Sequence, residues 1–190
     1  MKVLDSVLLV DDDEMSTRLH ENLIKELGLT RQVIARKNGR DALNYIKSTY
    51  TSNQKLPALI LSDLSMPVMD GFDFIHEMKN SELLGVKNIP IALVSVSAAE
   101  KDKKILEGFG NYPLVAKPLD EIKFFHILHH TIVPSLSLEH QIVIMERQRF
   151  LEEQRSYLIK QNGALRETLR NIRLRRQRIE EQFFKYKNNG

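Results

Sequence analysis

Cysteine is absent from the 190 residues of this chain. Its absence excludes disulfide bonds and thiolate metal sites, and it is compatible with a reducing compartment. The chain also lacks any apolar run close to the roughly 20 residues that a membrane-spanning helix needs. Its first five residues do not begin the apolar region of a signal peptide. We therefore expect a cytoplasmic protein without membrane association, whose function rests on groups other than thiols.

The composition indicates a soluble globular protein with an uneven charge. Apolar residues make up 42% of the chain and charged residues 28%, which are ordinary values for this class. Its length suggests one domain and an additional segment. Residues 1–133 carry 16 basic and 18 acidic side chains, a net charge of −2, whereas residues 134–190 carry 12 and 7, a net charge of +5. The overall charge of +3 therefore comes from the C-terminal segment.

Four short apolar segments, each predicted to be a buried strand, run directly into polar side chains. Residues 7–10 precede Asp11, Asp12 and Asp13; residues 58–61 precede Ser62 and Asp63; residues 91–94 precede Ser95; and residues 114–116 precede Lys117. In an open parallel sheet, the ligand crevice lies outside the carboxyl ends of the strands. We therefore expect these side chains to meet at one edge of a sheet.

Helical spacing of apolar residues predicts helices that alternate with these strands. The helices are expected over residues 14–27, 39–50, 71–78, 98–109 and 118–133, and residues 33–35 form a further short strand. The first helix has Gly28 as its C-terminal cap, Asp13 as its N-terminal cap, and an apolar face made by Met15, Leu19, Leu23, Ile24 and Leu27. Five alternations of strand and helix predict an α/β fold with a parallel sheet covered on both faces.

The motifs LLVDDD, LSDLSMPVMDG, IPIALVS and VAKP occur in this order between about residues 4 and 133. Together they resemble the receiver (CheY-like) domain of two-component response regulators. The resemblance implies a doubly wound, flavodoxin-like sheet of five parallel strands in the order 2-1-3-4-5. Strands one and three would then be neighbours at the topological switch point.

The resemblance also implies a role for each residue of the predicted site. Asp63 would be the phosphoacceptor, Ser95 the hydroxyl and Lys117 the lysine that pairs with Asp63 at rest. Mg²⁺ would be held by Asp12, Asp63 and the backbone carbonyl of Ser65, with Asp11 acting through a water molecule or orienting the cluster. The phosphoryl group would come from a sensor histidine kinase or a phosphotransfer protein. Enzymatic activity would be limited to self-catalysed phosphotransfer and autodephosphorylation.

Each of these residues also has a simpler interpretation when taken alone. Three adjacent aspartates suit the N-terminus of a helix, whose dipole favours acid. Asp63 could be a turn residue before Pro67, and Lys117 a solvated lysine in a loop. Because complementary groups follow four separate strands in order, the joint pattern favours a phosphoryl-transfer site.

Two positions depart from the family pattern, and the histidines suggest no second site. Leu114 stands where many receivers carry an aromatic switch residue, so rotation of a Tyr or Phe ring there cannot be the readout. Val96 is larger than the residue usual after the hydroxyl and could change hydrolysis rates.

His129 and His130 fit the end of a helix better than a zinc site, because adjacent helical side chains do not converge on one metal ion. His140 has no kinase-type motif beside it.

The C-terminal segment predicts a long helix after a linker. The linker covers residues 134–137, the helix 138–187, and a disordered end 188–190. Apolar residues recur every seven positions, at Ile144, Leu151, Leu158, Leu165, Ile172, Ile179 and Tyr186. Taking these as heptad position d leaves position a mostly polar, at Gln148, Arg155, Asn162, Leu169, Arg176 and Phe183. This pattern predicts a modest coiled coil, of either orientation, in which Asn162 favours two strands. The alternative is a single helix packed against the receiver. However, a helix of roughly 50 residues spans about 75 Å, which is far longer than the surface of a receiver, so most of it needs another partner.

We therefore expect a response regulator of a phosphorelay that has a receiver domain over residues 1–133 and is dimeric through its C-terminal helix. One alternative is a constitutively dimeric receiver scaffold in which phosphorylation is incidental. Another is a nucleic-acid regulator that uses the arginines between residues 170 and 178. Glu180 and Glu181 follow those arginines and no DNA-binding fold is evident, so a solvated helix face is favoured over nucleic-acid binding. A third is that an output enzyme domain follows in a longer chain.

Overall fold

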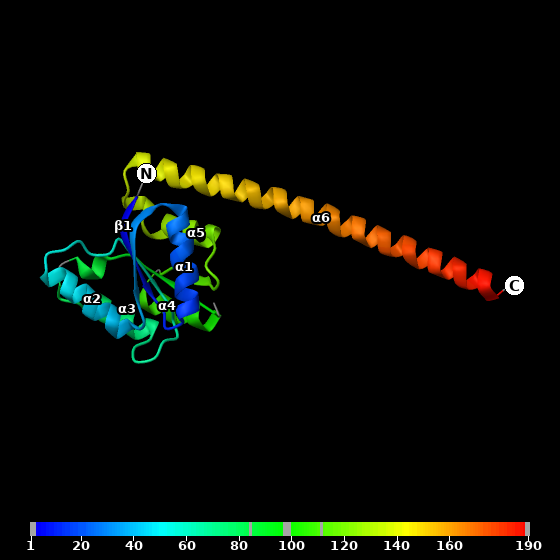
Figure 1. Cartoon of the computed structure of the whole chain (residues 1–190). Coiled ribbons are helices and arrows are strands. Elements are labelled where there is room, and N and C mark those ends of the chain that lie inside the picture. The colour runs from blue at the N-terminus through cyan, green and yellow to red at the C-terminus, as the bar shows by residue number, and fades with distance from the viewer. Residues whose placement is uncertain (1–2, 84, 97–99, 111, 189–190) are drawn as a thin grey trace. The chain divides into compact units, whose positions relative to one another are not determined.

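The computed structural model describes residues 3–83, 85–96, 100–110 and 112–188 (Figure 1). The side chains of residues 100–103, 105 and 175–188 are outside this description. The chain divides into two compact units, residues 1–145 and residues 146–190. The site lies in the first unit.

Within the described residues, five parallel strands form one sheet in the order β2-β1-β3-β4-β5. The strands are β1 (Leu4–Val10), β2 (Thr30–Arg36), β3 (Leu59–Ser62), β4 (Ile91–Ser95) and β5 (Leu114–Ala116). The predicted α/β fold and its strand order are confirmed. All four residues of β3 are buried, as expected for a central strand covered on both faces.

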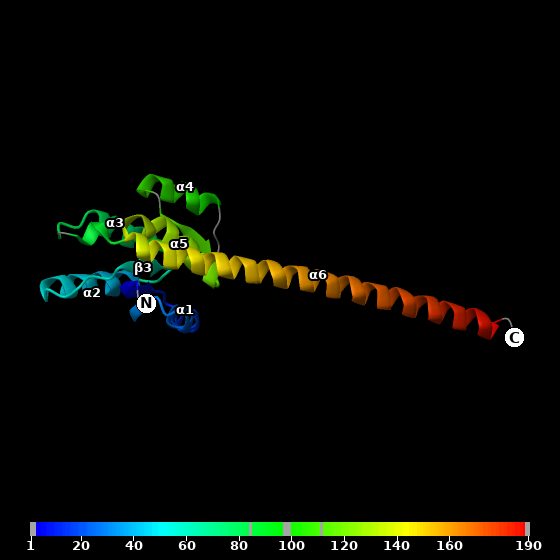
Figure 2. The ribbon, with the colours of Figure 1, turned by 90° about the horizontal axis from the view of Figure 1, so that it is seen from above.

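Helices lie on both faces of the sheet (Figures 1 and 2). The receiver unit contains α1 (Glu14–Leu27), α2 (Gly39–Thr51), α3 (Gly71–Lys79), α4 (Glu100–Phe109) and α5 (Glu121–Thr131), with 3-10 turns at Val86–Asn88 and Val133–Ser135. In Figure 1, α1 and α5 lie on one side of β1, and α2 and α3 on the other. The rings of Phe72 in α3 and Phe109 in α4 lie 6.1 Å apart, which places α4 beside α3.

The apolar side chains of the sheet and helices form the core. On the side of α2, α3 and α4, buried residues of β1, β3 and β4 such as Leu8, Ile60 and Leu93 pack with Phe74 and Ile75. On the side of α5, four residues are buried: Phe124, Phe125, Ile127 and Leu128. Burying one such side chain contributes roughly 1.5–3 kcal/mol. This core holds the strand ends in place.

The ends of the first helix are as predicted, but its buried face is not. The Asp13 carboxylate accepts hydrogen bonds from the backbone N–H groups of the first turn, and Gly28 ends the helix with a φ of 68°. The buried face, however, is formed by Ser16, His20, Ile24 and Leu27. Met15 and Leu19, expected on the apolar face, are exposed, with 73% and 58% of their surfaces accessible. The face towards the sheet is rotated because Ser16 and His20 find polar partners there.

The fifth helix begins three residues later than predicted. It starts at Glu121, with Asp120 as the N-cap accepting a hydrogen bond from the Lys123 backbone N–H. Residues 117–120 therefore form a connection between β5 and α5 instead of a first helical turn. The prediction from the sequence began the helix at Pro118. The Asp120 cap gives a better start, since its side chain satisfies a free N–H.

The last helix, α6, covers Leu138–Asn188. Its first residues belong to the receiver unit, where the Ile144 side chain is fully buried. Asn188, expected in a disordered end, is the last residue of α6, and residues 189–190 lie outside the described part. None of the described helices combines the length and the apolar character needed to cross a bilayer.

Candidate functional site

The register of the sheet places the predicted site residues at one edge. Val10 and Ser62 are partners in the parallel β1–β3 pair, so Asp11 and Asp63 follow at the same level on neighbouring strands. The Asp63 N–H donates to the Val10 carbonyl over 2.8 Å, which extends this register by one residue. On β4, Ser95 is the last residue, and its carbonyl accepts a hydrogen bond from the Lys117 N–H over 2.7 Å.

Lys117 joins the two buried aspartates. Its Nζ lies 2.6 Å from Oδ2 of Asp63 and 2.7 Å from Oδ2 of Asp11, and only 12% of its side chain is exposed. Burial alone would lower the pKa of Lys117, but the hydrogen bonds and charges of Asp11 and Asp63 outweigh it and raise the pKa above 10.5. The lysine therefore stays cationic at neutral pH and neutralises part of the negative charge.

The three acidic residues predicted as metal ligands also meet here. Asp11, Asp12 and Asp63 each offer a carboxylate oxygen, and these oxygens all lie within 4.8 Å of one another. Asp11 and Asp63 are buried, whereas Asp12 is exposed at the mouth of the site. Among the described residues, this is the one group of three or more His, Asp or Glu side chains close enough to hold an ion. Hard oxygen donors are the ligands that suit Mg²⁺.

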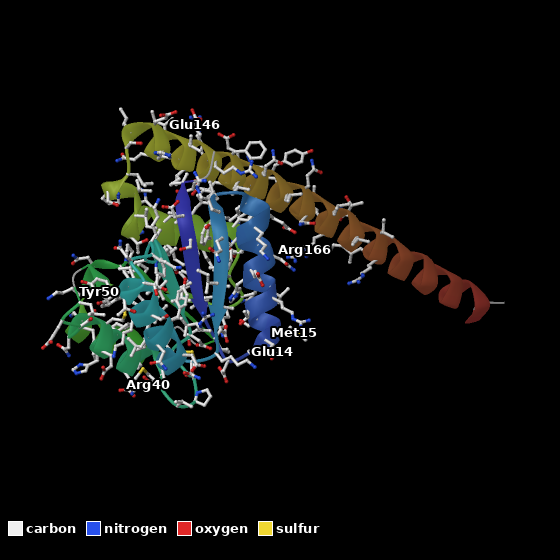
Figure 3. All side chains as sticks on the ribbon, turned by 60° about the vertical axis from the view of Figure 1, so that its left-hand side comes forward. Glu14, Met15, Arg40, Tyr50, Glu146 and Arg166 are labelled. Atoms are coloured by element: carbon white, nitrogen blue, oxygen red, sulfur yellow. The ribbon has the colours of Figure 1, made fainter. Side chains whose placement is uncertain are left out.

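The first helix orients Asp11. The Ser16 hydroxyl donates to Oδ2 of Asp11 over 2.7 Å, and the Asp13 backbone N–H donates to Oδ1 over 3.0 Å. Figure 3 marks this end of α1 by the labels on Glu14 and Met15. Sequence reasoning missed Ser16. Its position five residues after Asp11, in the first turn of the predicted helix, was the available signal.

The two serines of the predicted site lie at different depths. Ser95 is buried, with 6% of its surface exposed, and Val96 beside it is exposed. Ser65 is exposed, and its backbone N–H donates a long hydrogen bond to Oδ1 of Asp63 over 3.3 Å. The metal role of the Ser65 carbonyl and the hydroxyl role of Ser95 stay predictions.

Gly71 holds the loop after Asp63 close to the start of α3. The Gly71 N–H donates to the Leu64 carbonyl over 2.9 Å. A Cβ atom at this position would lie 2.5 Å from the Asp63 carbonyl oxygen and 2.9 Å from the Leu64 Cα. Both are backbone atoms that cannot turn away. The glycine is therefore required by the approach of α3 to the loop that carries the phosphoacceptor candidate.

His20 is a second residue whose place sequence reasoning missed. It is 5% exposed on α1, and its Nε2 accepts a hydrogen bond from the Leu119 backbone N–H over 3.2 Å. Burial lowers the pKa of His20, against the attraction of the Asp11 charge. By contrast, His129 and His130 are exposed in the last turn of α5, where cations are favoured.

Comparisons with known proteins match the same part of the chain. The family model for the response regulator receiver domain matches residues 7–129. "Two-component response regulator ARR22" of Arabidopsis thaliana is 32% identical over 129 residues, which cover 68% of this chain and 84% of that protein. "Polar-differentiation response regulator DivK" of Brucella anthropi is 26% identical over 123 residues, 65% of this chain and 92% of that protein.

Larger proteins and solved structures show the same module. "Hybrid signal transduction histidine kinase D" of Dictyostelium discoideum is 30% identical over 111 residues, which make up 54% of this chain and only 7% of that protein. The structure of "the bacteriophytochrome response regulator AtBRR" superposes with a TM-score of 0.60 at 26% identity, covering 67% of this chain and 92% of that one. Most of α6 lies beyond these matches.

Proposed function

Since this chain belongs to the response regulator receiver domain family of two-component systems, we propose that Asp63 accepts a phosphoryl group from a phosphohistidine. The donor is a sensor histidine kinase or a phosphotransfer protein, the partners with which receiver domains interact. The observation that carries the proposal is the contact of Lys117 Nζ with both Asp63 and Asp11 at the carboxyl edge of the sheet. It brings nucleophile, cation and acidic cluster from three separate strand ends to one point.

The transfer is a substitution at phosphorus. A carboxylate oxygen of Asp63 forms a new O–P bond while the P–N bond of the phosphohistidine breaks, and the electron pair of that bond returns to the imidazole nitrogen. The product on this chain is an acyl phosphate. The reaction is reversible in principle, and attack of water on the acyl phosphate returns the free carboxylate.

Positioning and charge neutralisation supply most of the catalysis in such a transfer. Lys117 already lies 2.6 Å from Oδ2 of Asp63, so its ammonium group can pass from the carboxylate to an oxygen of the incoming phosphoryl group. The raised pKa of Lys117 keeps that group charged. The buried Ser95 hydroxyl is assigned as donor to a second phosphoryl oxygen.

The acidic residues fit a divalent cation, because three carboxylate oxygens lie within 4.8 Å of one another. Receiver domains bind Mg²⁺ at such an acidic pocket. Asp12 and Asp63 would hold the ion here with the Ser65 carbonyl, and Asp11 would act through water or orient the cluster. When bound, the ion neutralises negative charge on the phosphoryl oxygens.

Labelling with a small acyl phosphate tests the site. Full-length protein is expected to take up phosphate with Mg²⁺ and not in excess chelator, because Asp63 must approach an anionic group beside two other carboxylates. Asp63→Asn should abolish labelling. Asp13→Asn is the matched control, since Asp13 caps α1 and should label normally. Equal labelling of the Asp63 variant, or labelling in chelator, contradicts the assignment.

The C-terminal helix is the proposed output. Phosphorylation at Asp63 would shift the equilibrium between two arrangements of the face formed by α4 and α5, and α5 leads into α6 through the 3-10 turn Val133–Ser135. Leu158, Leu165 and Ile172 are all more than half exposed at position d. Burying each would contribute roughly 1.5–3 kcal/mol. We therefore assign α6 as a homodimerising coiled coil, weakened by the polar residues at position a.

Light scattering on the full-length protein tests the dimer. The double variant Leu158→Asp with Leu165→Asp should dissociate it. The matched control changes exposed apolar residues outside position d, Tyr157→Asp with Leu174→Asp, and should leave the dimer intact. A double variant that stays dimeric contradicts the coiled-coil assignment. A mass that does not respond to a phosphoryl analogue favours the alternative, a constitutively dimeric scaffold.

A further inference from the structure

The connection between β5 and α5 is held on both sides of Lys117 by hydrogen bonds. At Lys117 itself, the backbone N–H donates to the Ser95 carbonyl over 2.7 Å. Two residues later, the Leu119 N–H donates to Nε2 of His20, which is 99 positions away in the chain. Pro118, between them, has no N–H to donate. The His20 bond is therefore the second anchor of a four-residue segment that carries the site lysine.

Leu119 needs a partner at this point. Its side chain is 7% exposed and it belongs to neither the sheet nor the helix, so its buried N–H has no ladder or helical acceptor. A buried N–H without a partner costs roughly 1–3 kcal/mol. His20 reaches it from α1, on the same buried face as Ser16, which orients Asp11. The first helix thus contacts both the acidic cluster and the lysine segment.

The bond requires a neutral imidazole, because Nε2 must offer a lone pair. Burial lowers the pKa of His20; the Asp11 charge opposes this effect, and the Lys117 charge adds to it. At neutral pH the ring is therefore an acceptor at Nε2, and the proton lies on Nδ1. A protonated ring would present a second N–H to the Leu119 N–H and would break the anchor.

We propose that His20 is a positioning residue for phosphoryl transfer: its Nε2 holds the Leu119 backbone so that Lys117 Nζ contacts Asp63 and Asp11. The effect of His20 on phosphoryl transfer rests on the proposed function. Its effect on the position of Lys117 does not. The alternative is that His20 only fills space in the core. The two roles predict different results when another hydrogen-bond acceptor replaces the imidazole. It should restore the position of Lys117 only if His20 is a positioning residue.

Two substitutions separate these roles. His20→Leu keeps an apolar side chain of similar size and removes the acceptor. His20→Gln places an amide oxygen near the position of Nε2 and keeps it. Ile24→Val is the matched control, because Ile24 is fully buried on the same face of α1 and its side chain has no hydrogen-bonding group.

The first readout is the position of Lys117 in full-length protein, measured by the NMR signal of its ammonium group. That signal is observable when two carboxylate partners slow its exchange with water. It should be lost or shifted towards that of an exposed lysine in His20→Leu, and retained in His20→Gln and Ile24→Val. This readout does not depend on phosphorylation, so it decides the geometry even if the wild type fails to label and the proposed function falls.

The second readout is phosphorylation by acetyl phosphate in saturating Mg²⁺. His20→Leu should lower the rate constant at saturating donor roughly tenfold, the factor for loss of about one hydrogen bond. His20→Gln should recover it to within about twofold, and Mg²⁺ affinity should change little, since Lys117 is not a ligand. The proposal is overturned by a Leu variant that keeps the ammonium signal, by a Gln variant as slow as Leu, or by an equal loss in Ile24→Val.

Discussion

A methyl group added at Gly71 should damage the receiver more than one added at any other described glycine of ordinary backbone conformation. The Cβ of Gly71→Ala would lie 2.5 Å from the Asp63 carbonyl oxygen and 2.9 Å from the Leu64 Cα. Neither atom belongs to a flexible side chain, so α3 or the loop after Asp63 must move. Overpacking of this kind costs typically 1–3 kcal/mol, and we expect the upper part of that range.

Two other glycines serve as comparisons for the destabilisation expected of Gly71→Ala. At Gly39, a Cβ would lie 2.7 Å from Met69 Cγ and 2.9 Å from Phe74 Cβ. The Met69 side chain is flexible and neither contact is a backbone atom, so Gly39→Ala should destabilise the domain by less than Gly71→Ala. At Gly108, in α4, there is nothing within 4 Å. Gly108→Ala should leave the free energy of unfolding unchanged or raise it by up to about 1 kcal/mol, through its better helix propensity.

Urea denaturation of the three variants, followed by circular dichroism, gives the order directly. The expected order of stability is Gly108→Ala, then Gly39→Ala, then Gly71→Ala. Labelling by a small acyl phosphate should fall in Gly71→Ala even well below its unfolding midpoint, because the displaced backbone carries Asp63. A Gly71 variant as stable as wild type, or less affected than the Gly39 variant, refutes the argument from close backbone approach.

Three further predictions concern the charges of the site. Asp12→Ala should weaken Mg²⁺ binding more than Asp13→Ala does, because Asp12 belongs to the acidic trio and Asp13 caps α1; a metal titration that ranks them the other way contradicts this. Lys117→Met leaves two buried carboxylates without their cation and should lower the free energy of unfolding by about 3 kcal/mol in chelator, with partial recovery in Mg²⁺; an equal loss in both buffers would show that the charges are not the cause. The pKa of His20 is lower in the folded protein than the ordinary value of 6.5, so the unfolded chain binds more protons below that pH and stability should fall as pH drops below 6.5. His20→Gln should show a smaller fall over the same range, and equal slopes in urea titrations would contradict the assignment.

The first helix shows where a pattern of apolar residues is insufficient. Met15 and Leu19 have helical spacing and were predicted to be buried, yet both are exposed. The buried positions one residue later are Ser16 and His20, which contact Asp11 and the Leu119 backbone. Hydrophobicity alone cannot predict this rotation, because the partners that make these polar residues suitable for burial come from other parts of the fold.

The strand ends show the opposite case. Asp11, Asp63 and Lys117 were predicted to meet from their positions after apolar segments, and the structure brings the carboxylates of Asp11 and Asp63 within hydrogen-bonding distance of Lys117 Nζ. That inference works because parallel strands end at the same edge of a sheet, so local position along each strand already determines which side chains become neighbours. The fifth helix begins at Glu121 and not at Pro118 as predicted, but this does not affect the inference, because Lys117 precedes both residues.

The amino-acid sequence was therefore sufficient to predict the class of fold and the acidic and basic groups at the strand ends, because these depend on short-range pattern. The strand order came from the resemblance of the motifs to the receiver family. Tertiary structure alone decided which groups orient the acidic and basic side chains. Ser16 on Asp11, Gly71 against the Asp63 backbone and His20 on Leu119 are contacts between segments that only folding brings together. Such contacts depend on the distance and angle between packed elements. No periodicity in a single segment encodes that geometry.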